Sequence, residues 1–205
     1  MNHLIFDKKR VISFSDAIFS IAITLLVLEI SIPSYKLIEQ HGTWVVLQSK
    51  IPSFIGLVVS FFVIALYWVT HMRITKYVST VNNKLLWLNI FLLLFIVLLP
   101  FSTAFYVGSF NLTGPFIFYC FNLSSIALIN YLMIKYIIKK ENGQTGLKNT
   151  IGKWEKARAM NSFWVWIFSG IMAFIFPTTS RYLFLLIFLI NPLINRVYIK
   201  KGLDI

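Results

Sequence analysis

The chain has 205 residues, of which 58% are hydrophobic and 13% are charged, and its mean hydropathy is +0.78. A soluble domain of this size could not bury so much apolar surface, so the composition predicts a polytopic membrane protein. The formal net charge of +12 comes without a basic module interleaved with aromatic residues, so we expect no nucleic-acid partner.

Six apolar runs are long enough to cross a bilayer, which takes a helix of about 18–20 residues. They cover approximately residues 10–32, 51–73, 85–107, 114–135, 159–177 and 181–198. We therefore expect an all-α fold with one six-helix transmembrane domain over residues 1–205; a count of five would require the last two runs to merge. Pro100 and Pro192 fall inside runs and should kink their helices.

The distribution of basic residues predicts the orientation. Sixteen of the 19 lysines and arginines lie in the N-terminal segment or in residues 73–84, 135–158 and 196–205, and the alternate loops keep only three. Cytoplasmic loops are rich in Lys and Arg, so both termini are predicted to be cytoplasmic. The first run contains Asp16 and is long, so we expect it to insert as a helix and not to be cleaved as a signal peptide.

The first run also carries ionisable residues, Arg10 and Asp16. Such groups within a membrane cost about 2.5–3.5 kcal/mol on insertion scales, so they usually pair, face a protein interior or line a pathway. Two neighbouring stripes follow from helical spacing. One is polar (Ser13, Asp16, Ser20, Thr24) and the other is apolar (Phe14, Ala17, Ile21, Leu25, Leu28).

Two interpretations of this helix remain open. The hydroxyls can act as hydrogen-bonding contacts between packed helices, with Arg10 and Asp16 as an internal ion pair. Alternatively, the helix lines a central pathway, and its aliphatic stripe forms constrictions that close by dewetting. His71 ends the second run at the same side of the membrane, so we expect a hydrogen-bonded cluster of Arg10, Asp16 and His71.

Residues for catalysis or metal binding are scarce. Cys120 is the only cysteine, and the three histidines and seven carboxylates are scattered along the sequence. No phosphate-binding loop, dinucleotide fingerprint or zinc motif is present. We therefore expect neither an enzyme nor a cofactor, and we interpret Cys120 as a core residue. A Thr-Val-Gly-Tyr-Gly potassium filter is also absent.

Three stretches resemble the transmembrane protein 175 family, the lysosomal potassium channels, in its short bacterial branch. The first is the block Arg10-x-x-x-Phe14-Ser15-Asp16, which continues to Glu29 and Pro33. The second is Tyr67-Trp68-x-x-His71, and the third runs from Asn83 through Asn89 to Leu99-Pro100-Phe101-Ser-Thr103. The resemblance covers residues 8–107 well and the remainder only by helix count and the basic fourth loop.

This resemblance implies a homotetramer in the bacterial inner membrane, with the first helix of each subunit lining a pore for monovalent cations and a modest preference for potassium. By position, Ile21 forms the narrowest hydrophobic ring, Leu25 and Leu28 form further layers, and Thr24 influences which cation passes. Arg10, Asp16 and His71 match the interhelical polar network of the family, beside Phe14 and Ser15 of the motif.

Two weaker assignments come from the residues themselves. Ser20 lies at the edge of the pore-facing stripe and could replace water around a cation, and Glu29 could attract cations at the outer mouth. Amphipathicity alone would turn the polar stripe toward water, whereas the resemblance turns the aliphatic stripe there. We follow the resemblance, because buried carboxylates are better placed beside Arg10 and His71 than facing one another.

The competing interpretation is an alternating-access carrier for a cation or small solute. Such proteins often contain inverted repeats and broken helices. Pro100 and Pro192 occupy the third helix of each half, but the Phe-Ser-Asp block has no counterpart near Asn161.

Overall fold

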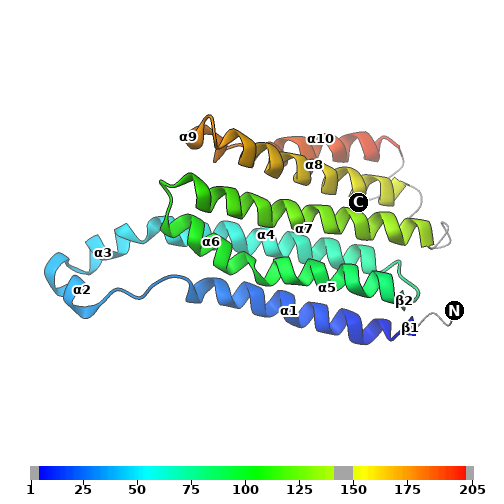
Figure 1. The fold of residues 1–205 in the computed structure, drawn as a ribbon, viewed down its shortest axis with the longest axis horizontal. Coiled ribbons are helices and arrows are strands. Elements are labelled where there is room, and N and C mark those ends of the chain that lie inside the picture. Colours follow the sequence, from blue (N-terminus) through cyan, green and yellow to red (C-terminus); the bar gives the residue numbers. More distant parts are fainter. Residues whose placement is uncertain (1–4, 141–149, 202–205) are drawn as a thin grey trace.

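The computed structural model describes residues 5–140 and 150–201. Within them, long helices run along one common axis (Figure 1). The long elements are α1 (Lys8–Leu28), α4 (Ile51–Thr75), α5 (Asn83–Val97), α6 (Leu99–Gly108), α7 (Thr113–Lys140), α8 (Thr150–Met172) and α10 (Leu185–Ile199). The short ones are β1 (Ile5–Phe6), α2 (Tyr35–His41), α3 (Thr43–Ser49), β2 (Val81–Asn82) and α9 (Pro177–Ser180).

Each predicted apolar run contains a helix, which confirms a mainly helical membrane protein. Within the described residues, four segments are long and apolar enough to cross a bilayer, namely α1, α4, α5 with α6, and α7, and α10 is a shorter apolar helix. The count of six spans stays a prediction. The helix α8 begins nine residues before the predicted run, because its first turns are charged and hydropathy does not register them. The strands β1 and β2 were not expected; they form a two-residue antiparallel pair.

The third predicted span is interrupted where proline was expected to disturb it. The helix α5 ends at Val97, and α6 restarts at Leu99 with Pro100 in its first turn. Proline lacks the N–H that an unbroken helix would need there, and a first turn tolerates its absence. By contrast, α10 continues through Pro192.

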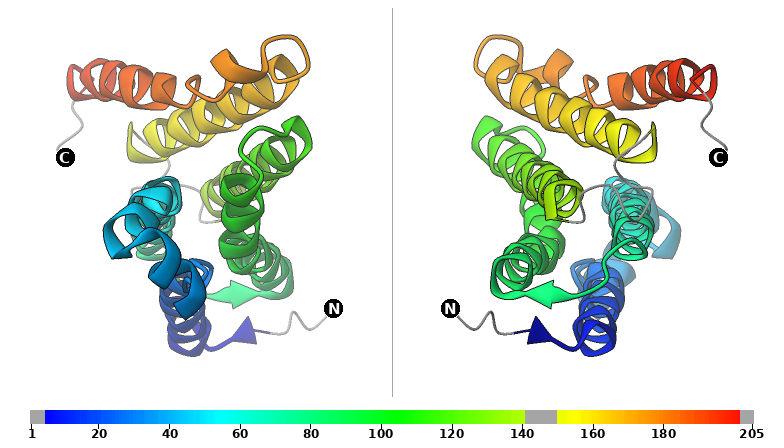
Figure 2. Two further views of the ribbon diagram at one scale, coloured as in Figure 1. Left: turned by 90° about the vertical axis from the view of Figure 1, so that its left-hand side faces the viewer. Right: turned by 90° about the vertical axis from the view of Figure 1, so that its right-hand side faces the viewer.

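Seen along the bundle axis, the helices form successive layers (Figure 2). The helix α1 lies at one extremity, where it packs on α4, α5 and α6. The helix α7 follows and packs on α8, which in turn contacts α10 at the opposite extremity. Between α1 and α4, the short helices α2 and α3 form an arm that extends past the end of the bundle (Figure 1).

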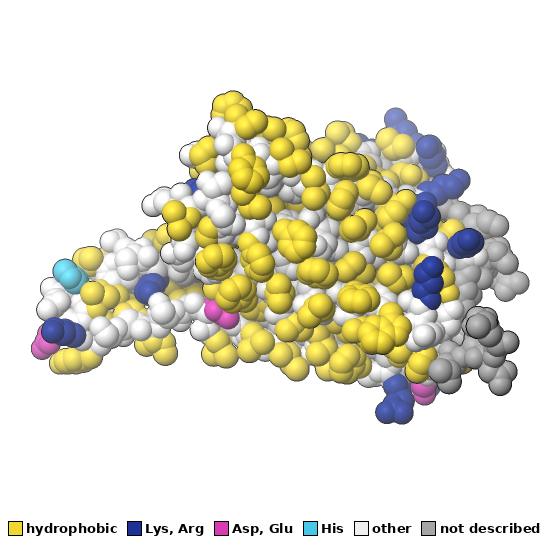
Figure 3. All heavy atoms as spheres, viewed as in Figure 1, with side chains coloured by type: hydrophobic (Ala, Val, Ile, Leu, Met, Phe, Trp, Pro, Cys, Tyr) yellow, Lys and Arg dark blue, Asp and Glu magenta, His cyan; other side chains and the backbone are white. Residues whose placement is uncertain are grey.

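The surface matches a membrane position. Hydrophobic side chains cover the face of the bundle shown in Figure 3, and Lys and Arg gather at the end that holds β1 and β2. The predicted orientation requires basic residues at one end of the bundle and an apolar surface along the spans. Which side is cytoplasmic stays a prediction.

Small polar contacts join the buried helices. The hydroxyls of Ser60 and Thr103 lie 2.8 Å apart between α4 and α6. The amide of Asn122 donates to Ser102 Oγ at 3.0 Å, joining α7 to α6. Helix association in lipid relies on such close packing and interhelical hydrogen bonds. Cys120 is buried in α7, as predicted for a core residue.

A close approach of α4 and α6 at Gly56 generates a test of this packing. A Cβ added at Gly56 would lie 2.5 Å from Val107 Cγ2, whereas one added at Gly108 meets nothing within 4 Å. We expect Gly56→Ala to lower the free energy of unfolding by about 1–3 kcal/mol through overpacking. Gly108→Ala should change it by less than about 0.5 kcal/mol.

Thermal unfolding of the detergent-solubilised protein, followed by circular dichroism, measures both effects. The double variant Gly56→Ala with Val107→Ala should regain part of the loss, because it removes the clashing methyl groups. Equal unfolding of the two glycine variants would contradict the close approach.

Candidate functional site

The helix α1 is held at its start by a side-chain cap. The Asp7 carboxylate accepts hydrogen bonds from the backbone N–H groups of Lys9, at 2.7 Å, and Arg10, at 3.4 Å. The helix then continues for 21 residues to Leu28. At 1.5 Å per residue it is roughly 31 Å long, which matches the hydrocarbon core of a bilayer.

One face of α1 is buried against its neighbours. Ser15, Phe19, Ala22 and Leu26 are at most 2% exposed. Their spacings of 4, 3 and 4 residues place them on a single helical face. This face contacts α4, α5 and α6 and fixes which side of α1 points away from the bundle.

A chain of hydrogen bonds runs through this buried face. The Asn89 amide donates to Ser15 Oγ at 2.8 Å, and Asn89 Oδ1 lies 2.8 Å from His71 Nε2. Because that amide oxygen only accepts, His71 Nε2 is the donor in this bond. All three residues are at most 3% exposed, so these hydrogen bonds join α1, α5 and α4 inside the protein.

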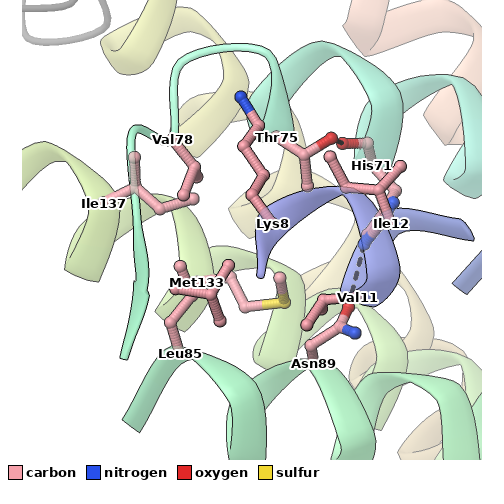
Figure 4. Close-up of a pocket in the computed structure, with 11 residues that line it drawn as sticks. Lys8, Val11, Ile12, His71, Thr75, Val78, Leu85, Asn89, Met133 and Ile137 are labelled. Atoms are coloured by element: carbon pink, nitrogen blue, oxygen red, sulfur yellow. Dashed lines mark hydrogen bonds between the residues drawn. The ribbon is translucent and has the colours of Figure 1, made fainter. Parts of the chain in front are cut away.

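A small cavity of about 20 Å³ adjoins this hydrogen-bond chain (Figure 4). Its lining includes His71 and Asn89 together with Val11 and Ile12 of α1. That volume has room for about one water molecule. Among the described residues, His71 Nδ1 is a buried nitrogen without a hydrogen-bond partner.

Asp16 joins α1 to α4 by a different contact. Its carboxylate accepts a hydrogen bond from Trp68 Nε1 at 2.9 Å. The next polar residues of this stripe bond to their own helix, since Ser20 Oγ donates to the Asp16 carbonyl and Thr24 Oγ1 to the Ile21 carbonyl, each at 2.9 Å.

The predicted cluster of Arg10, Asp16 and His71 does not form within one chain. In the described ranges, neither a hydrogen bond nor an ion pair joins the exposed Arg10 side chain to the other two. The reason is rotational, because six residues along a helix place Arg10 about 120° from Asp16 around the axis.

The opposite face of α1 is open. Phe14, Ile21 and Leu28 are 58%, 50% and 74% exposed, and Leu25 is half-buried. The same side also exposes Ser13, Ala17, Ser20, Thr24 and, past the helix end, Glu29. The aliphatic and hydroxyl stripes are therefore neighbours on one open face, with only Asp16 turned toward α4.

Two residues of this site had no assigned role in the sequence. Trp68 lies three positions before His71, so both fall on nearby sides of α4. Asn89 is a lone amide in an apolar run, and such a residue within a membrane usually has a polar partner. The sequence positions of Trp68 and Asn89 therefore indicate polar contacts, but they do not predict which helix each residue contacts.

The comparisons with known proteins identify the family of this chain. The family described as "Endosomal/lysosomal potassium channel TMEM175" matches residues 10–100. A protein of Chryseobacterium sp. strain P1-3, named a potassium channel, is 31% identical over 144 residues, which cover 70% of this chain and 72% of that one. The chain belongs to the TMEM175 family. The matched range contains the open face of α1, Trp68, His71 and Asn89.

Two further relatives, also named potassium channels, match a shorter region. A Streptomyces collinus protein is 42% identical over 98 residues, and a Chamaesiphon minutus protein is 41% identical over 98 residues. Each match covers 48% of this chain. It covers 47% of the Streptomyces protein and 48% of the Chamaesiphon protein, so this chain spans about half of the length of these two relatives.

Solved structures show the same fold. The crystal structure of a TMEM175 homologue from Chamaesiphon minutus, titled a lysosomal potassium-selective channel, aligns with a TM-score of 0.78 at 24% identity, over 93% of this chain and 97% of that one. A variant of the potassium channel MtTMEM175, in complex with a nanobody fusion, aligns with a TM-score of 0.68 at 22% identity, over 97% of each chain.

The buried hydrogen-bond chain generates a prediction. We expect Asn89→Ala to destabilise the protein by about 1–3 kcal/mol, because it leaves buried polar atoms of Ser15 and His71 without their partner. Asn83→Ala is the control, since Asn83 is exposed in the first turn of the same helix. Thermal unfolding in detergent measures both, and equal effects would contradict a special role for Asn89.

Proposed function

We propose that the protein is a cation channel with a modest preference for potassium, whose pore is lined by α1 of four subunits. The observation that carries this proposal is the one-sided packing of α1. One face is buried and hydrogen-bonded, while the other exposes aliphatic and hydroxyl side chains along the length of a membrane span. Membership in the family and the names of the relatives support it.

A single α1 cannot enclose a pathway, so the open face needs copies of itself around an axis. The number four follows from the family resemblance of a chain with one six-helix unit. In this arrangement each subunit crosses the membrane six times, with both termini in the cytoplasm of a bacterial cell. The gathering of Lys and Arg at one end of the bundle supports that orientation (Figure 3).

The chemistry of the open face suits a gate that excludes water. A ring of Ile21 side chains narrower than a hydrated cation holds no continuous water, so desolvation supplies the barrier. Leu25 and Leu28 extend this dry region toward the end of the helix. A slight rotation or splay of α1 would widen the ring and wet it, and potassium gives up its hydration more readily than sodium.

The hydroxyl oxygens of Ser20 and Thr24, beside the proposed Ile21 ring, are free to accept contacts from a cation. Ser20 and Thr24 each donate their hydroxyl proton to a backbone carbonyl of α1. Their oxygen lone pairs remain as acceptors, because a hydroxyl has one donor and two acceptor sites. These oxygens can partly replace the water that a cation loses at Ile21. Glu29 lies past the end of α1, where four carboxylates would concentrate cations at the outer mouth.

The first test replaces the proposed ring. Ile21→Asn should increase the current and lower the selectivity for potassium over sodium, because a polar side chain keeps the constriction hydrated. Ile171→Asn is a matched control, since Ile171 is similarly exposed, at 54%, on the distant helix α8. Bilayer recording under asymmetric KCl and NaCl measures both, and an unchanged Ile21→Asn current would count against the ring.

The second test asks whether water reaches the open face. Cysteines introduced at Ile21, Leu25 and Leu28 should react with water-soluble thiol reagents, whereas Ala22→Cys on the buried face should not. Native Cys120 is only 2% exposed, so it adds little background. Labelling is quantified by mass spectrometry. Modification by lipid-soluble reagents alone at the three open-face positions would place them in lipid and not in a pore.

The break between α5 and α6 is the one observation that favours a carrier, since carriers use discontinuous helices. Unitary current steps in the same recordings separate the two functions, because carriers turn over too slowly to produce them.

A further inference from the structure

A large groove lies on the side of the molecule away from α1. It has a volume of about 460 Å³ and is bounded by α4, α8 and α10, with Asn130 of α7 also in its lining. Most of its wall is apolar, with Phe62 and Leu66 from α4, Ala159 from α8, and Phe184 and Phe188 from the α10 side. Its volume is within the range of about 300–1,000 Å³ that is typical of ligand pockets.

One end of the groove is charged. Glu155 is 1% exposed and pairs with Arg73 Nη1 at 2.6 Å. The guanidinium groups of Arg73 and Arg158 both lie over the Trp154 ring, at 4.9 and 4.8 Å from its centroid. Trp154 Nε1 in turn donates to Asn195 Oδ1 at 2.7 Å, which joins this end to α10.

This end carries more positive than negative charge. Two guanidiniums converge near one carboxylate, and the ion pair joins that carboxylate to Arg73. Arg158 Nε is buried and, among the residues described, has no hydrogen-bond partner. Arg158 as a whole is half-buried, and the charge of Glu155 compensates it in part. Two guanidiniums beside one carboxylate still leave an excess of positive charge, which an anion in the groove would balance. The groove is therefore complementary to a ligand with one negative group.

The position of the charge within the groove narrows the class of ligand. Arg73 lies in the last turn of α4, and Glu155 and Arg158 lie in the first turns of α8. The last turn of α4 and the first turns of α8 lie at the end of the bundle that holds β1 and β2 (Figure 1), which is the end where Lys and Arg gather (Figure 3). The apolar wall extends from there toward the middle of the span. A phospholipid has this same order, with its phosphate at the interface and its acyl chains in the hydrocarbon core.

We propose that this groove binds an anionic phospholipid, with its phosphate at Arg158 and an acyl chain between α4 and α10. Arg158 would donate from its terminal guanidinium nitrogens to a phosphate oxygen, a charge-assisted hydrogen bond of the kind that arginine favours. A second copy of the chain fits less well, because each chain has only seven carboxylates, and Asp16 and Glu155 are already engaged.

The test measures lipid binding without any current, so its outcome is independent of the proposed channel function. The full chain, purified in a maltoside detergent, is titrated with phosphatidylglycerol or phosphatidylcholine, and bound lipid is counted by native mass spectrometry. We expect retention of phosphatidylglycerol over phosphatidylcholine. Arg158→Gln should weaken phosphatidylglycerol binding at least about tenfold. Arg196→Gln should change it less than about twofold, since Arg196 is an exposed arginine of α10 outside the groove.

A second variant separates groove binding from a loss of folding. Ser162→Phe fills the groove from α8 and leaves the charged end intact, so it should also abolish preferential retention. Equal binding of the two lipids by the native chain would overturn the proposal, as would equal losses in Arg158→Gln and Arg196→Gln. A third outcome would also overturn the proposal. If the native protein retains no phospholipid and the Ser162→Phe variant has a different oligomeric state from the native protein, the groove is a contact between copies of the chain.

Discussion

The hydrogen-bond chain from Ser15 through Asn89 to His71 sets the rotation of α1 about its own axis. Each member is buried between helices, so turning α1 would break hydrogen bonds that lipid cannot restore. Asp16 adds a second fixed point through Trp68. The open face of α1, and with it the proposed pore lining, follows from these contacts.

The helix α4 has side-chain contacts both with the elements around α1 and with α8. His71 and Arg73 are two residues apart, which places them on nearly opposite sides of the helix. His71 faces the Asn89 amide and the contacts of α1, whereas Arg73 pairs with Glu155 of α8. A phospholipid bound beside α8 and α10 would therefore contact the same helix that positions α1, and this offers a physical route from lipid composition to the pathway.

Polar groups have distinct environments in this protein. Those on the buried face of α1 bond to other helices and hold it in place. Those on its open face, Ser20 and Thr24, bond only to their own backbone and leave acceptor oxygens outward. The hydroxyl protons of Ser20 and Thr24 are thus satisfied, while their oxygens stay exposed beside Ile21.

Local information in the chain was sufficient for the membrane class, for a helix in each apolar run, for the break near Pro100 and for the family, because apolar length, proline chemistry and the Phe-Ser-Asp block do not depend on distant residues. It did not locate the start of α8 or the short elements between the long helices. It also predicted one polar cluster of Arg10, Asp16 and His71, which does not form within one chain. The partners of Asp16 and His71 came only from the tertiary structure, which pairs them with Trp68 and Asn89 and leaves Arg10 outside. Which residues Asp16 and His71 contact depends on how the neighbouring helices are rotated about their axes, and side-chain packing between the helices sets that rotation. The same packing creates the groove beside Arg158, whose walls come from segments far apart in the sequence.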